Sequence, residues 1–269
     1  MPAVSQALVD WANGFRQPPQ PGFEITETPR YRLVMQPDFP VAGPNSATFI
    51  RCRAENADSL IAEVAALFEA RGLPLMWVLD PDTEPANFAD FLAARGFVPD
   101  PHAPESAVMV MPISARLDVT PIAGLDLRDG IADLEAFRQV DAVNAEAFEG
   151  RIVGDDPSYL AQLGRRLRNQ KSAANRRVIL ATIDGEPAGS AGMSLHPPDG
   201  AILNGGAVRP KFRGRGVYRA MVAARVEMAR EDGVLGLSVW GGPMSAPILE
   251  RMGFQKVGWR RFYRRVSQL

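Results

Sequence analysis

Helical and strand-like patterns of apolar residues alternate along the whole chain. Between residues 58 and 71 apolar side chains recur at helical spacing, and Gly72 follows where a helix commonly ends. A compact apolar run at 75–79 is typical of a buried strand. In the first part of the chain we therefore expect helices over 4–15, 58–71 and 84–95 and strands over 31–35, 48–53, 75–79 and 108–111.

The second part of the chain alternates in the same way but in a different order. Asp184-Gly185 separates two apolar runs and predicts a tight β-hairpin. We expect helices over 131–148, 157–169, 216–231 and 245–252 and strands over 178–183, 188–196, 201–208, 235–240 and 259–266. The fold class is therefore α/β (α+β with a mixed sheet), and the connection after Pro112 predicts domains at 1–118 and 119–269.

Composition limits the classes of function. Of the 269 residues 46% are hydrophobic and 23% charged, and 30 Lys and Arg balance 31 Asp and Glu. The net charge is close to zero, so no strong electrostatic field is expected to attract nucleic acid or an anionic membrane. No apolar run approaches the roughly 20 residues that span a bilayer. Cys52 is the single cysteine and lies far from the two histidines, so neither an internal disulfide nor a metal site is expected. We expect a soluble, cytoplasmic protein.

The segment from 201 to 228 carries the clearest chemical signal. A β-branched strand ends at Val208, Pro210 prevents its extension, and the run 213–216 (Arg-Gly-Arg-Gly) leads into an amphipathic helix. Glycines allow backbone N–H groups to turn inward, and the helix N-terminus adds partial positive charge. This loop is therefore expected to hold a phosphate-type anion. A dinucleotide-binding motif does not explain it, because a third glycine in register is missing.

This segment resembles the pyrophosphate-binding motif of the GNAT superfamily of N-acetyltransferases, Arg/Gln-x-x-Gly-x-Gly/Ala after a strand that ends in Val-x-Pro. Tyr218 departs from the motif, since the family has Gly or Ala there. The run 252–254 (Met-Gly-Phe) is similar to the family's Leu-Gly-Phe before the last strand. The resemblance covers the chain from residue 125 to the end. It implies acetyl-CoA as co-substrate, held by Gly206, Ala207, Val208, Arg213, Gly214, Arg215, Gly216, Val217 and Tyr218.

The first part of the chain is similar to the N-terminal half of tandem GNAT proteins, with an unrelated α/β cap domain as the alternative. This resemblance depends on three features: the run 75–78, an acidic turn after it, and a helix that ends at 95–97 (Arg-Gly-Phe). Nothing in residues 1–112 matches the loop at 213–218, so we expect a smaller, degenerate GNAT-like half that binds no cofactor. We expect it to contribute to the acceptor pocket, with Trp77 either a wall residue or part of its core.

The resemblance implies direct transfer of an acetyl group from the CoA thioester to an amine, with backbone groups at 206–208 positioning the thioester. The sequence does not identify the catalytic base or acid, and Leu249 stands where the family usually has a tyrosine acid. A thiolate leaves tolerably without an acid, so water is an alternative. The side chains that remain as candidates for catalysis are Ser245, Tyr218 and Asn204. Tyr263 is a further candidate for the acid, and Glu146 and Glu149 are further candidates for the base or else solvated helix charges.

Three hypotheses remain open. The first is an active acetyltransferase on a small-molecule or peptide amine, and the second is a catalytically inactive acetyl-CoA-binding or regulatory module, motivated by Leu249 and Tyr218. The third is a nucleic-acid-associated protein that uses the basic runs at 165–168 and 260–265, which the balanced net charge disfavours. No membrane partner is expected, and the sequence indicates neither the acceptor nor an oligomeric state.

Overall fold

The computed structural model describes residues 3–149 and 154–265, and its chain divides into two compact units. Unit 1 comprises Met1–Arg16, Met109–Val239 and Pro247–Val257. Unit 2 comprises Gln17–Val108, Trp240–Ala246 and Gly258–Leu269. The units therefore interleave along the chain, and the expectation of two domains that meet at residue 118 stays a prediction.

Unit 1 contains the predicted helix–strand alternation of the second part of the chain. Its strands follow the order β11-β10-β9-β8-β7, antiparallel from β7 to β10 and parallel between β10 and β11. The strands are β7 (Leu125–Asp129), β8 (Arg176–Ile183), β9 (Glu186–His196), β10 (Gly200–Val208) and β11 (Gly236–Gly241). The helices are α1 (Gln6–Gly14), α4 (Leu134–Asn144), α5 (Pro157–Ser172), α6 (Val217–Glu231) and α7 (Ala246–Arg251).

The hairpin between β8 and β9 confirms the prediction made from Asp184-Gly185. Ile183 pairs with Glu186 across the turn, and both central residues have positive φ, 52° at Asp184 and 83° at Gly185. Positive φ at both positions defines the turn whose twist matches that of paired antiparallel strands. The local sequence therefore sets the register of this hairpin.

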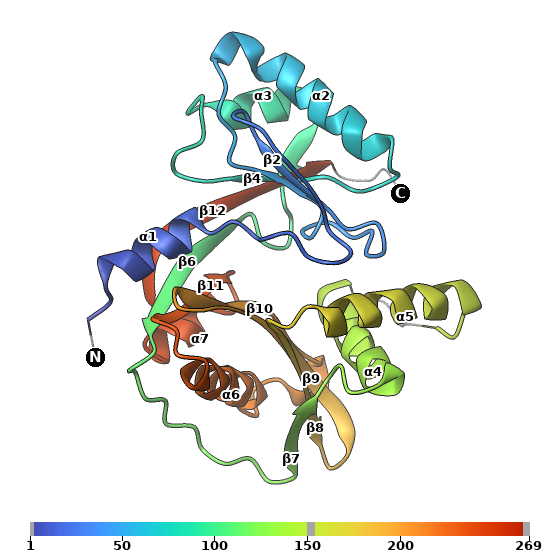
Figure 1. Cartoon of the computed structure of the whole chain (residues 1–269), viewed down its shortest axis with the longest axis vertical. Helices are drawn as coiled ribbons and strands as arrows, with labels where there is room; N and C mark the ends of the chain where they lie inside the picture. The colour runs from blue at the N-terminus through green and yellow to red at the C-terminus, as the bar shows by residue number, and fades with distance from the viewer. Residues whose placement is uncertain (1–2, 150–153, 266–269) are drawn as a thin grey trace. The chain divides into compact units, whose positions relative to one another are not determined.

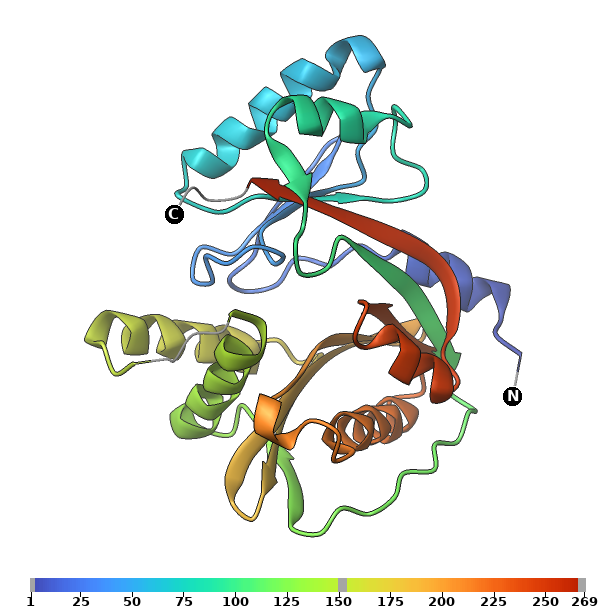
Figure 2. The ribbon, with the colours of Figure 1, turned by 180° about the vertical axis from the view of Figure 1, so that it is seen from behind.

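Helices cover both faces of the sheet in unit 1. Helix α6 packs on one face through Val217 and Met221, against β8 and β9 residues that include Ile179 and Ala191. Helices α4 and α5 pack on the opposite face, where Phe137 and other side chains bury Leu180. Figures 1 and 2 show α6 and the α4–α5 pair on opposite sides of β8 to β10. The predicted anion-binding loop at 213–216 leads into α6 and therefore lies on the same side of the sheet as this helix.

Unit 2 is a smaller α/β layer. Its strands follow the order β1-β2-β3-β4-β12, and β5 pairs with β12. The strands are β1 (Glu24–Glu27), β2 (Arg32–Met35), β3 (Ser46–Thr48), β4 (Met76–Leu79) and β5 (Phe97–Pro99), and the helices are α2 (Ala57–Glu69) and α3 (Phe88–Ala94). The chain passes between the units within β6 (Glu105–Pro112), β11, α7 and β12 (Gln255–Arg265).

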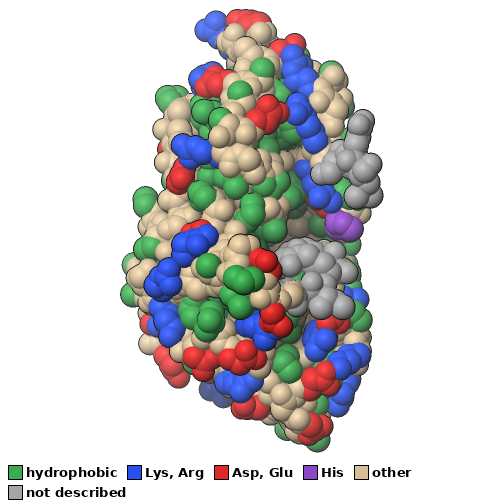
Figure 3. Space-filling model, turned by 90° about the vertical axis from the view of Figure 1, so that its right-hand side faces the viewer, with side chains coloured by type: hydrophobic (Ala, Val, Ile, Leu, Met, Phe, Trp, Pro, Cys, Tyr) green, Lys and Arg blue, Asp and Glu red, His purple; other side chains and the backbone are tan. Residues whose placement is uncertain are grey.

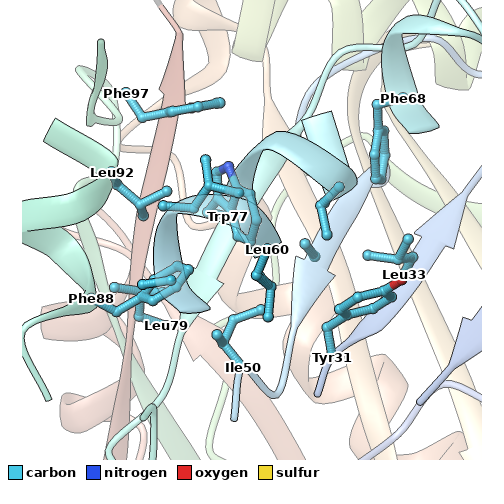
Figure 4. Close-up of a cluster of buried hydrophobic side chains, with 14 of the residues drawn as sticks. Tyr31, Leu33, Ile50, Leu60, Phe68, Trp77, Leu79, Phe88, Leu92 and Phe97 are labelled. Atoms are coloured by element: carbon cyan, nitrogen blue, oxygen red, sulfur yellow. The ribbon is translucent and has the colours of Figure 1, made fainter. Parts of the chain in front are cut away.

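Trp77 lies at the centre of the core of unit 2. Its side chain is 0% exposed, and its ring lies 5.6 Å from Phe88 and 6.0 Å from Phe97 between centroids (Figure 4). Of the two roles considered for Trp77, the core role is correct and the wall role is wrong, because a fully buried ring cannot line a pocket for an acceptor.

Several elements differ from the sequence-based expectation, and three of the differences have a local reason. The strand expected over 48–53 ends at Thr48, because Phe49 has φ 53°, a left-handed conformation that lies outside the β region and that a bulky side chain rarely adopts. The helix expected from residue 84 begins at Phe88, after Pro85, whose ring restricts the residue before it. The helix expected to reach residue 148 is α-helical only to Asn144 and continues as a π-helical turn over Ala145–Glu149. Within the described residues, no helix is long and apolar enough to cross a membrane.

Candidate functional site

Strand β10 has an irregular edge close to its end. Its pairing with β9 shifts register between Asn204 and Gly206, and Gly205 between them has φ 50°. On its other side, the parallel register with β11 joins Ala201 to Leu237 and Ile202 to Ser238. Within the described residues, β10 has no further register pair with β11 after Ile202, so its backbone edge there can accept an extended ligand in the manner of an added strand.

The loop after β10 has the geometry expected of an anion site. Gly214 and Gly216 adopt φ values of 78° and 87°, in the left-handed region that favours glycine. Gly216 is the N-cap of α6 and provides no side-chain hydrogen bond to the first turn. The positive end of the helix and its N–H groups therefore face the loop without a capping side chain. A phosphate group fits this arrangement.

Basic side chains surround this loop. Arg213 and Arg215 are exposed, and the Nε of Arg213 donates to the carbonyl oxygen of Val208 at 3.3 Å. The guanidinium of Arg215 lies 5.6 Å from the ring centroid of Phe212, which is 6% exposed and belongs to the core under α6. Phe212 thus anchors the loop while the two arginines keep their charge at the surface, where they can pair with phosphate oxygens.

Tyr218 lies against the irregular part of β10. A Cβ atom built on Gly206 would lie 2.8 Å from Cε2 of Tyr218 and 3.7 Å from Nη2 of Arg225. The tyrosine ring therefore occupies the space that a side chain at residue 206 would need. Tyr218 and Arg225 lie two turns apart on α6 and present their side chains to the same stretch of strand. Arg225 is a residue that the sequence analysis missed; its one sequence signal is a basic residue on the apolar face of a helix.

Asn204 begins a row of polar side chains along the sheet. Its Nδ2 donates to Oγ of Ser194 at 3.1 Å, and Nε2 of His196 lies 3.1 Å from the same oxygen. Burial, followed by the charge of Arg176, lowers the pKa of His196. Alternation along β9 puts Ser194 and His196 on one face, but the sequence does not indicate that Asn204 joins them.

Glu146, a candidate for the base, is engaged in an ion pair. Glu146 lies in the π-helical turn that follows α4, and its Oε2 lies 2.6 Å from Nε of Arg209. This carboxylate oxygen is therefore already occupied by the guanidinium of Arg209. The side chain of the second candidate, Glu149, lies outside the part of the chain that is described.

One further candidate, Ser245, lies close to α7, and Leu249 lies within this helix. The Oγ of Ser245 donates to the carbonyl oxygen of Gly242 at 3.4 Å, in a segment of unit 2. Leu249, at the position where the family usually has tyrosine, is 0% exposed. Its side chain packs as a core residue and offers no proton.

Some arginines of each basic run form ion pairs. Arg166 pairs with Asp141 at 2.7 Å in unit 1, and Arg261 and Arg264 pair with Glu105 and Asp100 at 2.9 and 2.7 Å in unit 2. On the face drawn in Figure 3, basic and acidic side chains are interspersed with hydrophobic ones. Such pairing leaves less uncompensated charge for a phosphate backbone.

Part of the chain matches a known protein family. Residues 141–254, which include β10, the loop and α6, match the model of the Acetyltransferase (GNAT) family. N-alpha-acetyltransferase RimI of Mycobacterium tuberculosis is 34% identical over 137 residues, which are 49% of this chain and 84% of that protein.

Solved structures share the fold over nearly the whole chain. A GCN5-related N-acetyltransferase from Kribbella flavida superposes with a TM-score of 0.64 at 15% identity, covering 91% of this chain and 90% of that one. A tandem GNAT protein from the clavulanic acid biosynthesis pathway gives a TM-score of 0.54 at 15% identity, covering 95% and 86%. The predicted mixed α/β fold class is confirmed, and a layout in two halves is consistent with these neighbours.

Proposed function

The chain belongs to the acetyltransferase (GNAT) family, and on that premise we propose that it transfers an acetyl group from acetyl-CoA directly to an amine. The observation that carries this proposal is the loop of Gly214 and Gly216. Its left-handed glycines and the uncapped start of α6 follow the part of β10 that comes after its register pairs with β11. An anion site beside an open strand edge suits a ligand that is a pyrophosphate at one end and an amide-containing chain at the other.

In this proposal the loop and the strand have separate tasks. The backbone and arginines of 213–218 hold the pyrophosphate, and the backbone of 206–208 positions the thioester. Bound acetyl-CoA supplies an acyl group on a good leaving group, so that the amine forms a C–N bond to the carbonyl carbon as the C–S bond breaks. The N–H groups at the β10 bulge stabilise the negative charge that develops on the carbonyl oxygen.

The chain must also accept one proton from the amine and supply one to the departing thiolate, or leave both to water. Tyr218 is our first candidate for the donor, because its ring contacts Gly206 at the bulge and a phenol can donate a proton. Asn204 is not a base, and we assign it to holding the amine or a water, with its Nδ2 already donating to Ser194. Ser245 and Glu146 have weaker support, because each is engaged in a local contact.

The name of the relative suggests a class of acceptor. RimI of Mycobacterium tuberculosis is an N-alpha-acetyltransferase, so we propose the α-amine of a peptide or small molecule as the first acceptor to test. The alternative function is a catalytically inactive acetyl-CoA-binding module, which is favoured by the buried Leu249 in place of a tyrosine acid.

Binding and turnover experiments distinguish these functions. Acetyl-CoA at 100 times its dissociation constant should stabilise the fold by about 2.7 kcal/mol, and free acetate should not. Calorimetric titration should give one acetyl-CoA per chain, because no second loop of this kind is present in the first part of the sequence. Release of CoA thiol with a panel of peptides and small amines should then identify the acceptor class. Binding without turnover on any amine supports the inactive module, and an unmoved melting temperature contradicts both functions.

A further inference from the structure

Arg225 is a buried cation at the centre of unit 1. It lies on α6 and is 1% exposed. Its Nη1 donates to the carbonyl oxygens of Gly192 at 2.9 Å and Gly205 at 3.3 Å, and its Nε donates to that of Met221 at 3.1 Å. The guanidinium is thus bonded to backbone carbonyls of its own helix, of β9 and of the β10 bulge.

This charge has no acidic partner in the described part of the chain. Its hydrogen bonds all go to carbonyl oxygens, and Tyr218 is the one side chain with an electrostatic influence on it. Burial lowers the pKa of Arg225 to about 10, and Tyr218 acts in the opposite direction. The side chain is therefore still cationic at neutral pH. A buried charge is costly unless something compensates it, and an apolar residue would fill the same position at lower cost.

The position of the contact suggests what the charge does. The peptide group that joins Gly205 to Gly206 carries the carbonyl that Arg225 binds. In a trans peptide the N–H points away from the C=O, so the N–H of Gly206 is directed away from the guanidinium. Hydrogen bonds in a chain polarise one another, and a cation on the carbonyl makes the N–H of the same peptide a stronger donor.

We propose that Arg225 is a positioning residue for acyl transfer, which fixes the peptide between Gly205 and Gly206 and strengthens its N–H as the donor to the thioester oxygen. This inference rests on the proposed function, since it needs the acetyl group to lie at the β10 bulge. Glycine at residue 206 is consistent with it, because a Cβ atom there would lie 2.8 Å from Cε2 of Tyr218 and 3.7 Å from Nη2 of Arg225. Arg225 itself does not touch the substrate in this mechanism.

The test compares three variants with the wild-type protein. Arg225→Met removes the charge and the donors, Arg225→Lys keeps the charge, and Arg230→Met is the matched control. Arg230 is also on α6 and also donates to backbone carbonyls, those of Ile113 and Ala115, but it has no contact with the bulge. If Arg225→Met does not fold, Arg225→Gln, which is neutral but still carries a donor, takes its place.

The decisive measurement is the infrared carbonyl stretch of bound acetyl-CoA labelled with ¹³C at the carbonyl carbon. The wild-type protein and Arg230→Met should lower this frequency relative to free acetyl-CoA, Arg225→Met should lower it less, and Arg225→Lys should fall between them. Where an acceptor is known, turnover of Arg225→Met should fall by about 10- to 100-fold, the effect of one lost hydrogen bond to a charged group. The KM for acetyl-CoA should change much less, because the pyrophosphate loop is intact.

Two results separate the failure of this inference from failure of the proposed function. If the wild-type protein does not bind acetyl-CoA, the proposed function is wrong. If it binds acetyl-CoA and the shift in Arg225→Met equals that of the wild-type protein, Arg225 only packs the sheet against α6, and the inference is overturned. A loss of stability with an unchanged carbonyl frequency leads to the same conclusion.

Discussion

Replacing Gly216 by alanine tests whether the left-handed geometry of the loop is required for acetyl-CoA. Gly216 has φ 87° and caps α6. A Cβ atom there would lie 3.3 Å from Cδ1 of Ile122, the flexible end of a side chain that can move slightly. The main effect is therefore on the backbone. Gly185→Ala is a matched control, because Gly185 has φ 83°, no atom within 4 Å of the added Cβ, and a place in the β8–β9 hairpin.

The size of the effect follows from the backbone angle. An L-residue in the left-handed region costs about 1–2 kcal/mol, and replacing glycine recovers about 0.4–1 kcal/mol from the unfolded chain. The net loss of stability is about 1 kcal/mol, or about 2–4 °C in melting temperature for a protein of this size. If the loop relaxes to negative φ instead, acetyl-CoA must restore the geometry, and its affinity falls by about 5- to 30-fold.

Differential scanning calorimetry and calorimetric titration of acetyl-CoA measure both quantities on the same samples. Gly216→Ala should lose stability, affinity or part of each. Gly185→Ala should lose stability with little change in affinity, because its turn belongs to another pair of strands. The turn is linked to the segment before the loop by surface ion pairs of Glu186 with Arg209 and Lys211, which contribute little. A Gly216→Ala protein with the melting temperature and affinity of the wild type would refute the reasoning. Equal loss of affinity in both variants would show that the effect does not come from the loop.

Two further predictions concern the neighbouring side chains. Gly206→Ala should destabilise the fold by about 1–3 kcal/mol, because the added methyl group clashes with Tyr218. In a Tyr218→Ala background this loss should disappear, and additive losses in urea denaturation would contradict the prediction. The pKa of His196 is lowered in the folded chain, so below pH 6.5 the unfolded chain binds a proton that the folded chain does not bind. The free energy of unfolding should therefore fall as pH drops below that value. His196→Gln should flatten that slope, and an unchanged slope would count against burial of the imidazole.

The elements predicted best from sequence are those whose signals are local. The hairpin at Asp184-Gly185 depends on two residues that tolerate positive φ, and the loop before α6 depends on glycines next to a helical pattern. Both are properties of a few consecutive residues. The strand expected over 48–53 and the helix expected from residue 84 were wrong at their ends, because Phe49 and Pro85 act on backbone geometry that apolar spacing does not reveal.

The fold class, the place of the glycine loop at 213–218 and the lack of a tyrosine at residue 249 all follow from the amino-acid sequence alone. Three other features depend on how distant segments pack: Trp77 is a core residue, Glu146 is paired with Arg209, and the guanidinium of Arg225 binds the carbonyl oxygen of Gly205. Glu146 and Arg209 are 63 residues apart, and Arg225 and Gly205 are 20 apart. Their meeting depends on the order of the strands and on which face of the sheet each helix covers, and neither is encoded in the periodicity of any one segment.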